Sequence, residues 1–340
     1  MTPTPLPEQS EFRHDVVSGR WVAFAPERAR RPLGQSKPSP RQDAVRDVCP
    51  FCPGPGHDTP APSHLSPADG PWQVLVCPNK FPAVRPIAPN TRGLTVRLNR
   101  NLLPGFGVHE VVVEGQGHVT NPADLSDEVF GRVLLAYRDR IKAFAADPRL
   151  DYAAVFKNVG AEAGASMAHS HSQVVATPFV PNAVRDELAG AGEYHRQTGR
   201  CVFCDEFDPA ADPDQRVVGE SARFVAGCPF APRFAYEFWV LPKAHASHYE
   251  SLTDAAAADL TGLLKRCLRA LDAVAGVPAY NSYLHTAPLR TAASPSYHWH
   301  LEVVPRTARP AGFEWGTGVF INTVPPERAA RELRAALPAG

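Results

Sequence analysis

The stretch that decides the fold is GASMAHSHSQVVATP, which runs from Gly164 to Pro178. Two histidines, His169 and His171, alternate with serines, and Gln173 follows at the same spacing before a run of β-forming residues. Side chains on a strand alternate between faces, so this spacing predicts that the two imidazoles and the amide share one face. Three polar groups in a row are poor material for a core. The pattern therefore favours a functional site over the plainer alternative, a row of surface or hydrogen-bonded histidines.

A second copy of the pattern, HWHLEVV at 298–304, occurs later in the chain. Each copy follows a Cys-x-x-Cys pair, a Cys-Pro segment, a strand, a long amphipathic helix and another strand, in the same order. An order preserved over this distance indicates a duplicated unit. We therefore expect two halves, residues 1–195, which contain the first H-x-H pair, and residues 196–340.

The expected fold class is α+β, with antiparallel sheets covered by helices, because each half is rich in strands and has one long helix. Whether the halves share one sheet is left open by the sequence. Hydrophobic and turn patterns predict strands and helices. The strands are expected at 19–25, 107–115, 152–158, 171–177, 235–241 and 298–304, and the helices at 126–147, 253–276 and 326–337.

The composition of the chain excludes some classes of partner and location. Lysine and arginine number 35, as do aspartate and glutamate, so the formal net charge is zero and neither nucleic acid nor an anionic membrane is expected as a partner. No apolar run approaches the roughly 20 residues of a membrane span. The N-terminal residues lack the features of a signal peptide, so a cytoplasmic location is expected. In that compartment the Cys-x-x-Cys pairs indicate metal binding more than disulfides.

These motifs resemble a known family, the galactose-1-phosphate uridylyltransferases, which form the transferase branch of the histidine-triad superfamily. HSHSQ corresponds to the family's H-x-H-x-Q signature, and further segments follow in family order from about residue 12 to 337. The most specific are PERARRP (26–32), CPFC (49–52), VCPNKFPAV (76–84), HEVVVEGQGH (109–118), FKNVGAEAGASMAHSHSQ (156–173), AYEFWVLPKAH (235–245) and GFEWGTGVFIN (312–322). The resemblance implies a duplicated histidine-triad-like fold and nucleotidyl transfer by double displacement.

The chemistry of the first H-x-H suits such a transfer. A double displacement needs a nucleophile that attacks the α-phosphorus and later leaves, and neutral imidazole does both. The resemblance assigns this role to His171, and it assigns Gln173 the role of donating to a phosphoryl oxygen. Histidine-triad hydrolases resemble this site but have a third histidine in place of the glutamine. The glycine-rich loop, with Gly164 and Ser166, is expected to bring backbone and hydroxyl groups to the phosphates.

The resemblance also implies metal sites. His169 would complete a closed structural zinc site with Cys49, Cys52 and His118, and His109 is the competing candidate for the His118 position. In the second half, zinc or iron is expected with Cys201, Cys204, His245 and His298 as ligands. The alternative ligands there are those of relatives that lack the second cysteine pair, and they correspond to Glu187, His285, His298 and His300. We favour the cysteine set because thiolates bind zinc more strongly than a carboxylate does.

Substrate contacts follow from the same resemblance. The phosphate contacts are expected at Arg28 and Arg31, whose guanidinium groups match phosphate oxygens. The nucleotide contacts correspond to Asn79 and Asn158, and the sugar-hydroxyl contact corresponds to Glu314.

Two positions depart from the family pattern. Lys80 stands where some members have an aspartate near the uridine, and Phe320 stands where others carry a glutamine. These differences concern the choice of base and sugar and leave the nucleotidyl transfer intact.

The expected enzyme is a UDP-glucose–hexose-1-phosphate uridylyltransferase. It would exchange the uridylyl group between UDP-glucose and galactose 1-phosphate through a uridylyl-His171 intermediate. Family members are commonly homodimers whose sites include residues of the neighbouring subunit. One alternative is an ADP-sugar phosphorylase or adenylyltransferase of the same family. Another is a zinc-stabilised nucleotide-binding module without turnover.

Overall fold

A computed structural model describes residues 10–30, 49–54, 56–86, 95–97, 100–102, 105–208 and 216–338. Arg31, one of the two expected phosphate contacts, lies outside these residues.

The framework is one ten-stranded sheet with the order β10-β11-β12-β14-β13-β8-β9-β7-β4-β3, in which every neighbouring pair is antiparallel. The strands of its first half are β3 (His64–Ser66), β4 (Val74–Pro78), β7 (Val108–Glu114), β8 (Tyr152–Val159) and β9 (His171–Thr177). Those of its second half are β10 (Val217–Glu220), β11 (Phe224–Gly227), β12 (Phe238–Pro242), β13 (Tyr280–His285) and β14 (His300–Pro305).

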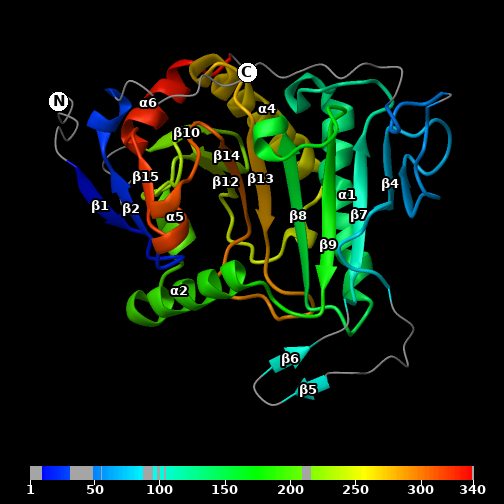
Figure 1. The fold of residues 1–340 in the computed structure, drawn as a ribbon, viewed down its shortest axis with the longest axis horizontal. Helices are drawn as coiled ribbons and strands as arrows, with labels where there is room; N and C mark the ends of the chain where they lie inside the picture. The colour runs from blue at the N-terminus through cyan, green and yellow to red at the C-terminus, as the bar shows by residue number, and fades with distance from the viewer. Residues whose placement is uncertain are drawn as a thin grey trace.

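The duplication is visible in the strand order. From either edge inward, the strands follow the same sequence order, β3-β4-β7-β9-β8 in one half and β10-β11-β12-β14-β13 in the other. The halves join where β8 pairs with β13, so they share a continuous sheet (Figure 1). The expected boundary between residues 195 and 196 falls inside α2 (Asn182–Thr198), and the division at that point stays a proposal.

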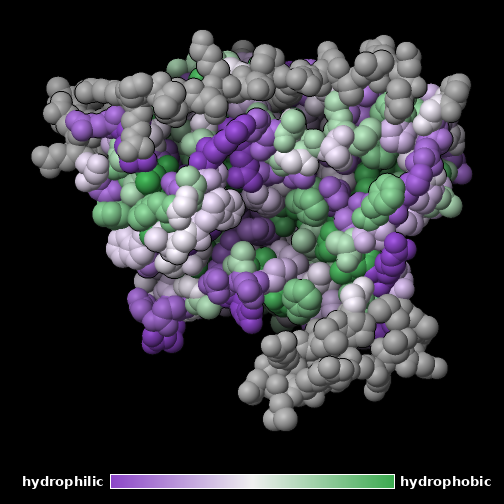
Figure 2. All heavy atoms as spheres, viewed as in Figure 1, coloured by the Kyte–Doolittle hydropathy of each residue, from purple (hydrophilic) through white to green (hydrophobic). Residues whose placement is uncertain are grey.

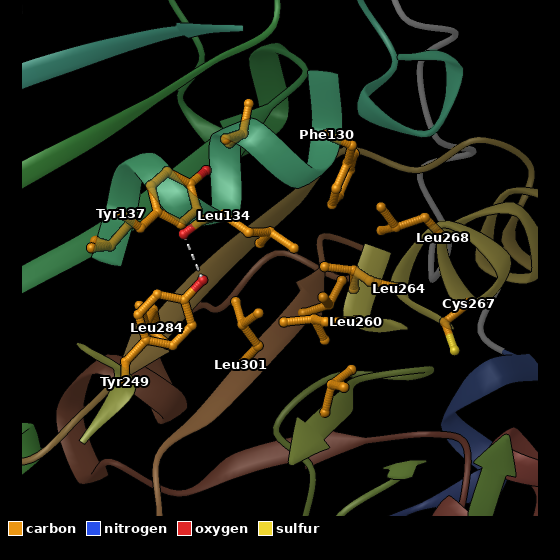
Figure 3. Close-up of a cluster of buried hydrophobic side chains, with 14 of the residues drawn as sticks. Phe130, Leu134, Tyr137, Tyr249, Leu260, Leu264, Cys267, Leu268, Leu284 and Leu301 are labelled. Atoms are coloured by element: carbon orange, nitrogen blue, oxygen red, sulfur yellow. Dashed lines mark hydrogen bonds between the residues drawn. The ribbon is translucent and has the colours of Figure 1, made fainter. Parts of the chain in front are cut away.

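Two long helices form the core with this sheet. α1 (Asp127–Ala145) and α4 (Asp254–Ala275) pack against each other, α1 over the strands of the first half and α4 over β10 and β11. Figure 3 shows Leu134 and Leu264 from the two helices among the side chains of this core. Burial of such apolar surface stabilises the fold by roughly 25 cal/mol per Å². The helices therefore hold the sheet from one side and leave the opposite face for the histidine motifs.

The remaining elements lie around this framework. A small sheet has the order β1-β2-β15, and Figure 1 shows it on the opposite side of the molecule from β9. Its strands are β1 (Glu11–His14), β2 (Trp21–Phe24) and β15 (Phe320–Asn322), and β5 (Thr95–Arg97) pairs with β6 (Arg100–Leu102). The other helices are α3 (Val202–Glu206), α5 (Gly312–Thr317) and α6 (Pro326–Ala335), with short 3-10 turns at η1 (Pro26–Arg30), η3 (Pro122–Asp124), η4 (Ala161–Ala163) and η5 (Tyr249–Ser251).

All six expected strands and all three expected helices are present, and most differ by a few residues at their ends. The strand expected at 235–241 begins only at Phe238, because Tyr236 adopts a left-handed backbone with φ 64°. The strand expected to carry the first H-x-H begins at His171, so His169 lies just before it.

Figure 2 shows polar and apolar residues interspersed on one face of the molecule. Among the described residues, none of the helices combines the length and apolar character of a membrane span.

Candidate active site

His171 is buried at the start of β9, and its ring is held in one orientation. Its Nδ1 lies 2.8 Å from the backbone oxygen of His169. A carbonyl only accepts hydrogen bonds, so Nδ1 carries the proton and donates it, which leaves a lone pair on Nε2. The ring of Phe51 packs 5.3 Å away, centroid to centroid. Nε2 is therefore the ring atom whose lone pair is left to meet a ligand.

The surroundings of His171 favour the neutral ring. Burial lowers the pKa of His171, the hydrogen bond to His169 opposes this effect, and the charge of Lys157 lowers the pKa further. A neutral imidazole has the lone pair that nucleophilic attack requires.

A buried ion pair supports this segment from behind. Lys157 on β8 contacts the Glu114 carboxylate and donates to Ser170 Oγ at 3.0 Å and to the His171 backbone oxygen at 3.1 Å. Glu114 also accepts from Ser170 Oγ at 2.6 Å and from Ser172 Oγ. Burial alone would raise the pKa of Glu114, but Lys157 and the two hydroxyls outweigh burial and lower it. Sequence reasoning missed this pair, although a lysine and a glutamate within apolar strands were a signal for it.

Gln173 follows on the same strand and is half-buried. Its Oε1 lies 2.7 Å from His109 Nε2 and 3.4 Å from Asn79 Nδ2. The amide oxygen is thus occupied by neighbours, and the NH₂ group is the part left to meet a ligand.

The glycine-rich loop after β8, expected to meet the phosphates, contains two glycines with a positive φ angle. Gly160 has φ 84° and its position has no room for a side chain, because an added Cβ would lie 2.9 Å from the Ala279 Cβ. Gly164 has φ 86°, and both Gly164 and Ser166 are exposed. The loop is anchored by Asn281, whose Nδ2 donates to the Ala163 backbone oxygen at 2.8 Å.

Asn281 also donates to Asn158 Oδ1 at 2.7 Å, and Arg306 Nε donates to Asn281 Oδ1 at 2.5 Å. This chain connects Asn158, an expected nucleotide contact, to an arginine of the second half. Neither Asn281 nor Arg306 belongs to a motif that would mark it in the sequence. The pairing of β8 with β13 brings Asn281 opposite Asn158, and the pairing of β13 with β14 brings Arg306 beside Asn281.

The first expected zinc group is assembled. The ligand atoms of Cys49, Cys52, His118 and His169 all lie within 4.8 Å of one another. Cys52 Sγ is 3.3 Å from His118 Nδ1 and 3.4 Å from His169 Nδ1. Tetrahedral zinc, with bonds of about 2.3 Å to sulfur and 2.0–2.1 Å to nitrogen, separates such atoms by about 3.5 Å. The donor set and its spacing therefore fit zinc.

His169 is also prepared as a ligand. Its Nε2 lies 3.1 Å from the backbone oxygen of Gly115, so Nε2 carries the proton and Nδ1 is free to bind metal. Burial lowers the pKa of His169 to about 4, which keeps the ring neutral. His109, the competing candidate, instead faces Gln173.

The second cysteine group is assembled in the same way. The ligand atoms of Cys201, Cys204, His245 and His298 lie within 4.8 Å of one another. Cys204 Sγ is 3.4 Å from Nδ1 of both histidines, and His245 Nε2 lies 2.9 Å from the backbone oxygen of Ser294. This donor set fits zinc as well.

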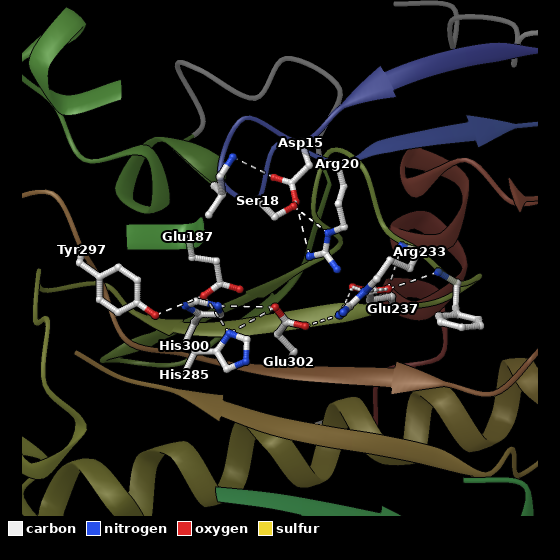
Figure 4. Close-up of polar contacts among 12 residues, drawn as sticks. Asp15, Ser18, Arg20, Glu187, Arg233, Glu237, His285, Tyr297, His300 and Glu302 are labelled. Carbon is white, nitrogen blue, oxygen red and sulfur yellow. Dashed lines mark hydrogen bonds and ion pairs between the residues drawn. The ribbon is translucent and has the colours of Figure 1, made fainter. Parts of the chain in front are cut away.

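The alternative ligands form a separate group, in which Glu302 takes the place that His298 had in the alternative set. Glu187, His285, His300 and Glu302 lie close together on one side of β14, with Arg233 beside them (Figure 4). His285 Nδ1 is 3.0 Å from Glu187 Oε2, and Arg233 contacts Glu302. Burial would lower the pKa of His285, but Glu187 outweighs it and raises the pKa. His285 lies beside the Glu187 carboxylate and Arg233 beside that of Glu302, so we interpret the group as an ion-pair network.

Two expected substrate contacts lie elsewhere in the chain. Arg28 is on η1, which follows β2, and Glu314 is on α5, where its Oε2 accepts from the Ala311 N–H at 2.8 Å. Figure 1 shows β2 and α5 on the side of the molecule away from β9. The structure therefore does not bring these two residues to His171 within one chain. Lys80, at a position that departs from the family pattern, pairs with Asp58 at 2.5 Å.

Comparisons with known proteins agree with this geometry. A family profile described as the N-terminal domain of galactose-1-phosphate uridyl transferase matches residues 4–181, and another, described as a domain of unknown function, matches residues 133–339. ADP-glucose phosphorylase from Arabidopsis thaliana is 38% identical over 332 residues, which cover 96% of this chain and 93% of that protein. The galactose-1-phosphate uridylyltransferase of Thermotoga maritima is 26% identical over 332 residues, covering 95% of this chain and 98% of that protein.

A solved structure agrees too. The crystal structure of the Arabidopsis thaliana ADP-glucose phosphorylase with bound ADP-glucose superposes with a TM-score of 0.82 at 38% identity, covering 96% of this chain and 99% of that chain. The duplicated α+β sheet with its H-x-H-x-Q strand defines a nucleotidyltransferase of the histidine-triad type. The chain belongs to the galactose-1-phosphate uridylyltransferase family and is an enzyme of that family.

Proposed function

We propose that this enzyme is an ADP-sugar phosphorylase that works through an adenylyl-His171 intermediate. The observation that carries the covalent step is the His171 ring, whose Nδ1–H is given to the His169 carbonyl while Nε2 keeps its lone pair. The choice of adenine and of phosphate is supported by the similarity to the Arabidopsis thaliana ADP-glucose phosphorylase, at 38% identity against 26% for the Thermotoga maritima uridylyltransferase.

In the first half-reaction, His171 Nε2 attacks the α-phosphorus of the ADP-sugar. An N–P bond forms, the bond from this phosphorus to the bridging oxygen breaks, and its electron pair leaves with the sugar 1-phosphate. The ring gains positive charge and keeps its proton on Nδ1, 2.8 Å from the His169 oxygen. The carbonyl dipole stabilises that charge, so no separate base is needed.

In the second half-reaction, an oxygen of inorganic phosphate attacks the same phosphorus. The N–P bond breaks, its electron pair returns to Nε2, and ADP leaves. Negative charge gathers on the phosphoryl oxygens in both half-reactions, and the NH₂ of Gln173 is suited to donate to one of them. Burial of His171 and the nearby Phe51 ring limit the access of water, which would otherwise hydrolyse the intermediate.

We propose zinc as the occupant of the two cysteine groups. Both sets are closed four-ligand sets of the structural kind, so the metal holds chain segments together and leaves the chemistry to the side chains. In the first site it would fix His169, whose backbone carbonyl orients the nucleophile.

A second copy of the chain would complete the site. Arg28 and Glu314, the expected phosphate and sugar contacts, lie away from His171 within one chain, on the side of β2 and α5 (Figure 1). A homodimer that brings this side against the β9 region of its partner would supply both groups, and we propose that the enzyme is such a dimer.

The second candidate is the exchange of a uridylyl group between UDP-glucose and galactose 1-phosphate. Membership of the family favours it, and the chemistry at His171 is the same. The two departures from the family pattern, Lys80 and Phe320, stand against it because they concern the base and the sugar.

The test is intact-mass spectrometry after brief mixing with ADP-glucose or UDP-glucose, without acceptor. A gain of one adenylyl group, discharged by phosphate as ADP, is the expected result. A uridylyl adduct discharged only by galactose 1-phosphate would establish the second candidate. The absence of an adduct with either donor would contradict covalent transfer altogether.

A further inference from the structure

Gln173 has two amide orientations of nearly the same shape, which exchange the positions of oxygen and nitrogen. Only the orientation with NH₂ toward the substrate stabilises a phosphoryl oxygen, because a carbonyl oxygen there would repel it. The groups that contact the other end of the amide therefore determine which orientation Gln173 adopts.

His109 lies beside that end. It pairs with Val175 across β7 and β9, while Gln173 pairs with Val111, so His109 and Gln173 are diagonal neighbours on one face of the sheet. His109 Nε2 is 2.7 Å from Gln173 Oε1. At this distance the two atoms share a hydrogen, and the nature of the donor fixes the amide.

The backbone identifies the donor. The N–H of Ala83 donates to His109 Nδ1 at 3.0 Å. A backbone N–H has no acceptor role, so Nδ1 of His109 is unprotonated and the proton of the neutral ring is on Nε2. Nε2–H then donates to Gln173 Oε1, whereas the flipped amide would set two donors against each other.

Asn79 supports the same orientation. The N–H of Phe81 donates to Asn79 Oδ1 at 2.8 Å, which turns the Asn79 NH₂ toward Gln173 Oε1, 3.4 Å away. The two donors share one acceptor, which accounts for the 3.1 Å between Asn79 Nδ2 and His109 Nε2. Two backbone N–H groups of the loop after β4 therefore set the amide of the site through two side chains.

We propose that His109 is a positioning residue that holds the NH₂ of Gln173 toward the transferred phosphoryl group. This inference rests on the proposed function, because it assumes that Gln173 acts on that group. His109 contacts neither cysteine group and enters no other step of the mechanism, so its contribution is separable.

Two substitutions divide the contacts of His109. Asparagine keeps an acceptor near the Nδ1 position for Ala83 but has no donor that reaches Gln173, whereas glutamine places an NH₂ near the Nε2 position. The measurement is the rate of adenylyl-enzyme formation at several ADP-glucose concentrations, by rapid mixing, acid quench and intact mass. His57→Asn is the matched control, because the His57 side chain is exposed and its ring contacts the neighbouring Thr59 hydroxyl.

The expected result is a maximal rate about tenfold lower in His109→Asn, with little change in the half-saturating concentration. His109→Gln should recover most of the lost rate, and His57→Asn should behave as wild type. In a Gln173→Ala background, His109→Asn should cause no further loss, since the two residues act as one unit. Melting temperatures and zinc content of all variants separate this effect from misfolding.

The opposite order, with His109→Asn active and His109→Gln impaired, would mean that His109 only anchors Ala83 and would overturn the proposal. Additive losses in the double variant would overturn it too. If the wild type forms an adduct and His109→Asn forms it equally fast, only this inference fails. If the wild type forms none with either sugar nucleotide, the proposed function fails and the inference with it.

Discussion

His171 and His300 occupy equivalent places in the two halves of the sheet, and their rings are oriented in the same way. Each begins a strand, β9 or β14. Each directs Nδ1 at the backbone carbonyl two residues earlier, 2.8 Å away for His171 and 3.1 Å away for His300. The H-x-H spacing therefore fixes the tautomer in both halves, and the difference between the halves lies around Nε2.

The ring of His300 is enclosed. It packs against both Phe203 and Trp239, with ring centroids 4.8 Å and 5.0 Å away, and its exposed fraction is 0%. Its Nε2 lies 3.6 Å from Glu302, at the position where the first half has Gln173. A carboxylate there repels a phosphate, whereas an amide donates to it. Under the proposed function, the residue two places after the motif and the enclosure of the His300 ring make the first half the catalytic one.

The largest expected effect on adenylyl transfer comes from removing the ring of His171, with removal of the His300 ring as the comparison. His171→Gly should lower adenylyl transfer by more than about 10⁴-fold, because no other group forms the covalent bond. The His300→Gln protein should still form the adduct but have a lower melting temperature, because the His300 ring only packs against aromatic side chains and contacts Glu302. Intact mass and thermal unfolding measure both. An adduct on the His171→Gly protein would mean that another residue is the nucleophile.

The metal sites extend the comparison. We expect two zinc ions per chain by metal analysis, one fewer in Cys49→Ser and one fewer in Cys201→Ser. Only Cys49→Ser should also slow adduct formation, because its site holds His169 and thereby His171. Cys201→Ser should destabilise the second half while the folded fraction keeps its transfer rate.

A third metal ion per chain would contradict the ion-pair interpretation of the group around Glu187. Loss of that ion in Glu302→Gln would then identify its ligands. An equal slowing of transfer in both cysteine variants would show that the first site has no special link to the nucleophile.

The next effect concerns the ion pair behind the nucleophile. Glu114→Gln leaves Lys157 buried without its charged partner and should destabilise the protein by about 3–5 kcal/mol at pH 7. The pKa of Glu114 is lowered from its ordinary value of 4.5, so its contribution is present above pH 4.5 and is lost as the pH falls below it. Unfolding by denaturant from pH 7 to 3 should therefore show a shallower acid loss in Glu114→Gln than in wild type. Equal slopes would contradict this assignment.

Much of the site was predictable from local patterns. The cysteine pairs, the two H-x-H motifs and the long helices each have spacing that fixes their geometry, and the structure assembles both cysteine groups as expected. Two contacts went beyond such patterns. Arg233 contacts Glu302, although Glu302 itself has the spacing of the motif, and Arg306 reaches the loop of Asn158 through Asn281. Contacts between distant strands leave no spacing in the sequence.

The expected substrate contacts show a different limit of prediction from a single sequence. Arg28 and Glu314 were assigned by resemblance, yet they lie on the β2 and α5 side of the chain, away from β9. A single sequence does not distinguish a contact within one chain from a contact between two copies. His109 is a third kind of case, because the sequence marked it only as a competing zinc ligand, while its proposed role depends on the Ala83 N–H.

The smallest expected effect compares the N-terminal caps of the two equivalent helices. Ser126 Oγ accepts from the Val129 N–H at the start of α1, and Thr253 Oγ1 accepts from the Ala256 N–H at the start of α4, both at 3.2 Å. Ser126→Ala and Thr253→Ala should each lower the free energy of unfolding by about 1 kcal/mol, because each leaves a backbone N–H of the first turn without its partner. Since α1 and α4 belong to one core, we expect both substitutions to shift a single unfolding transition measured by circular dichroism. Two separate transitions, each moved by one substitution alone, would show instead that the halves unfold independently despite their shared sheet.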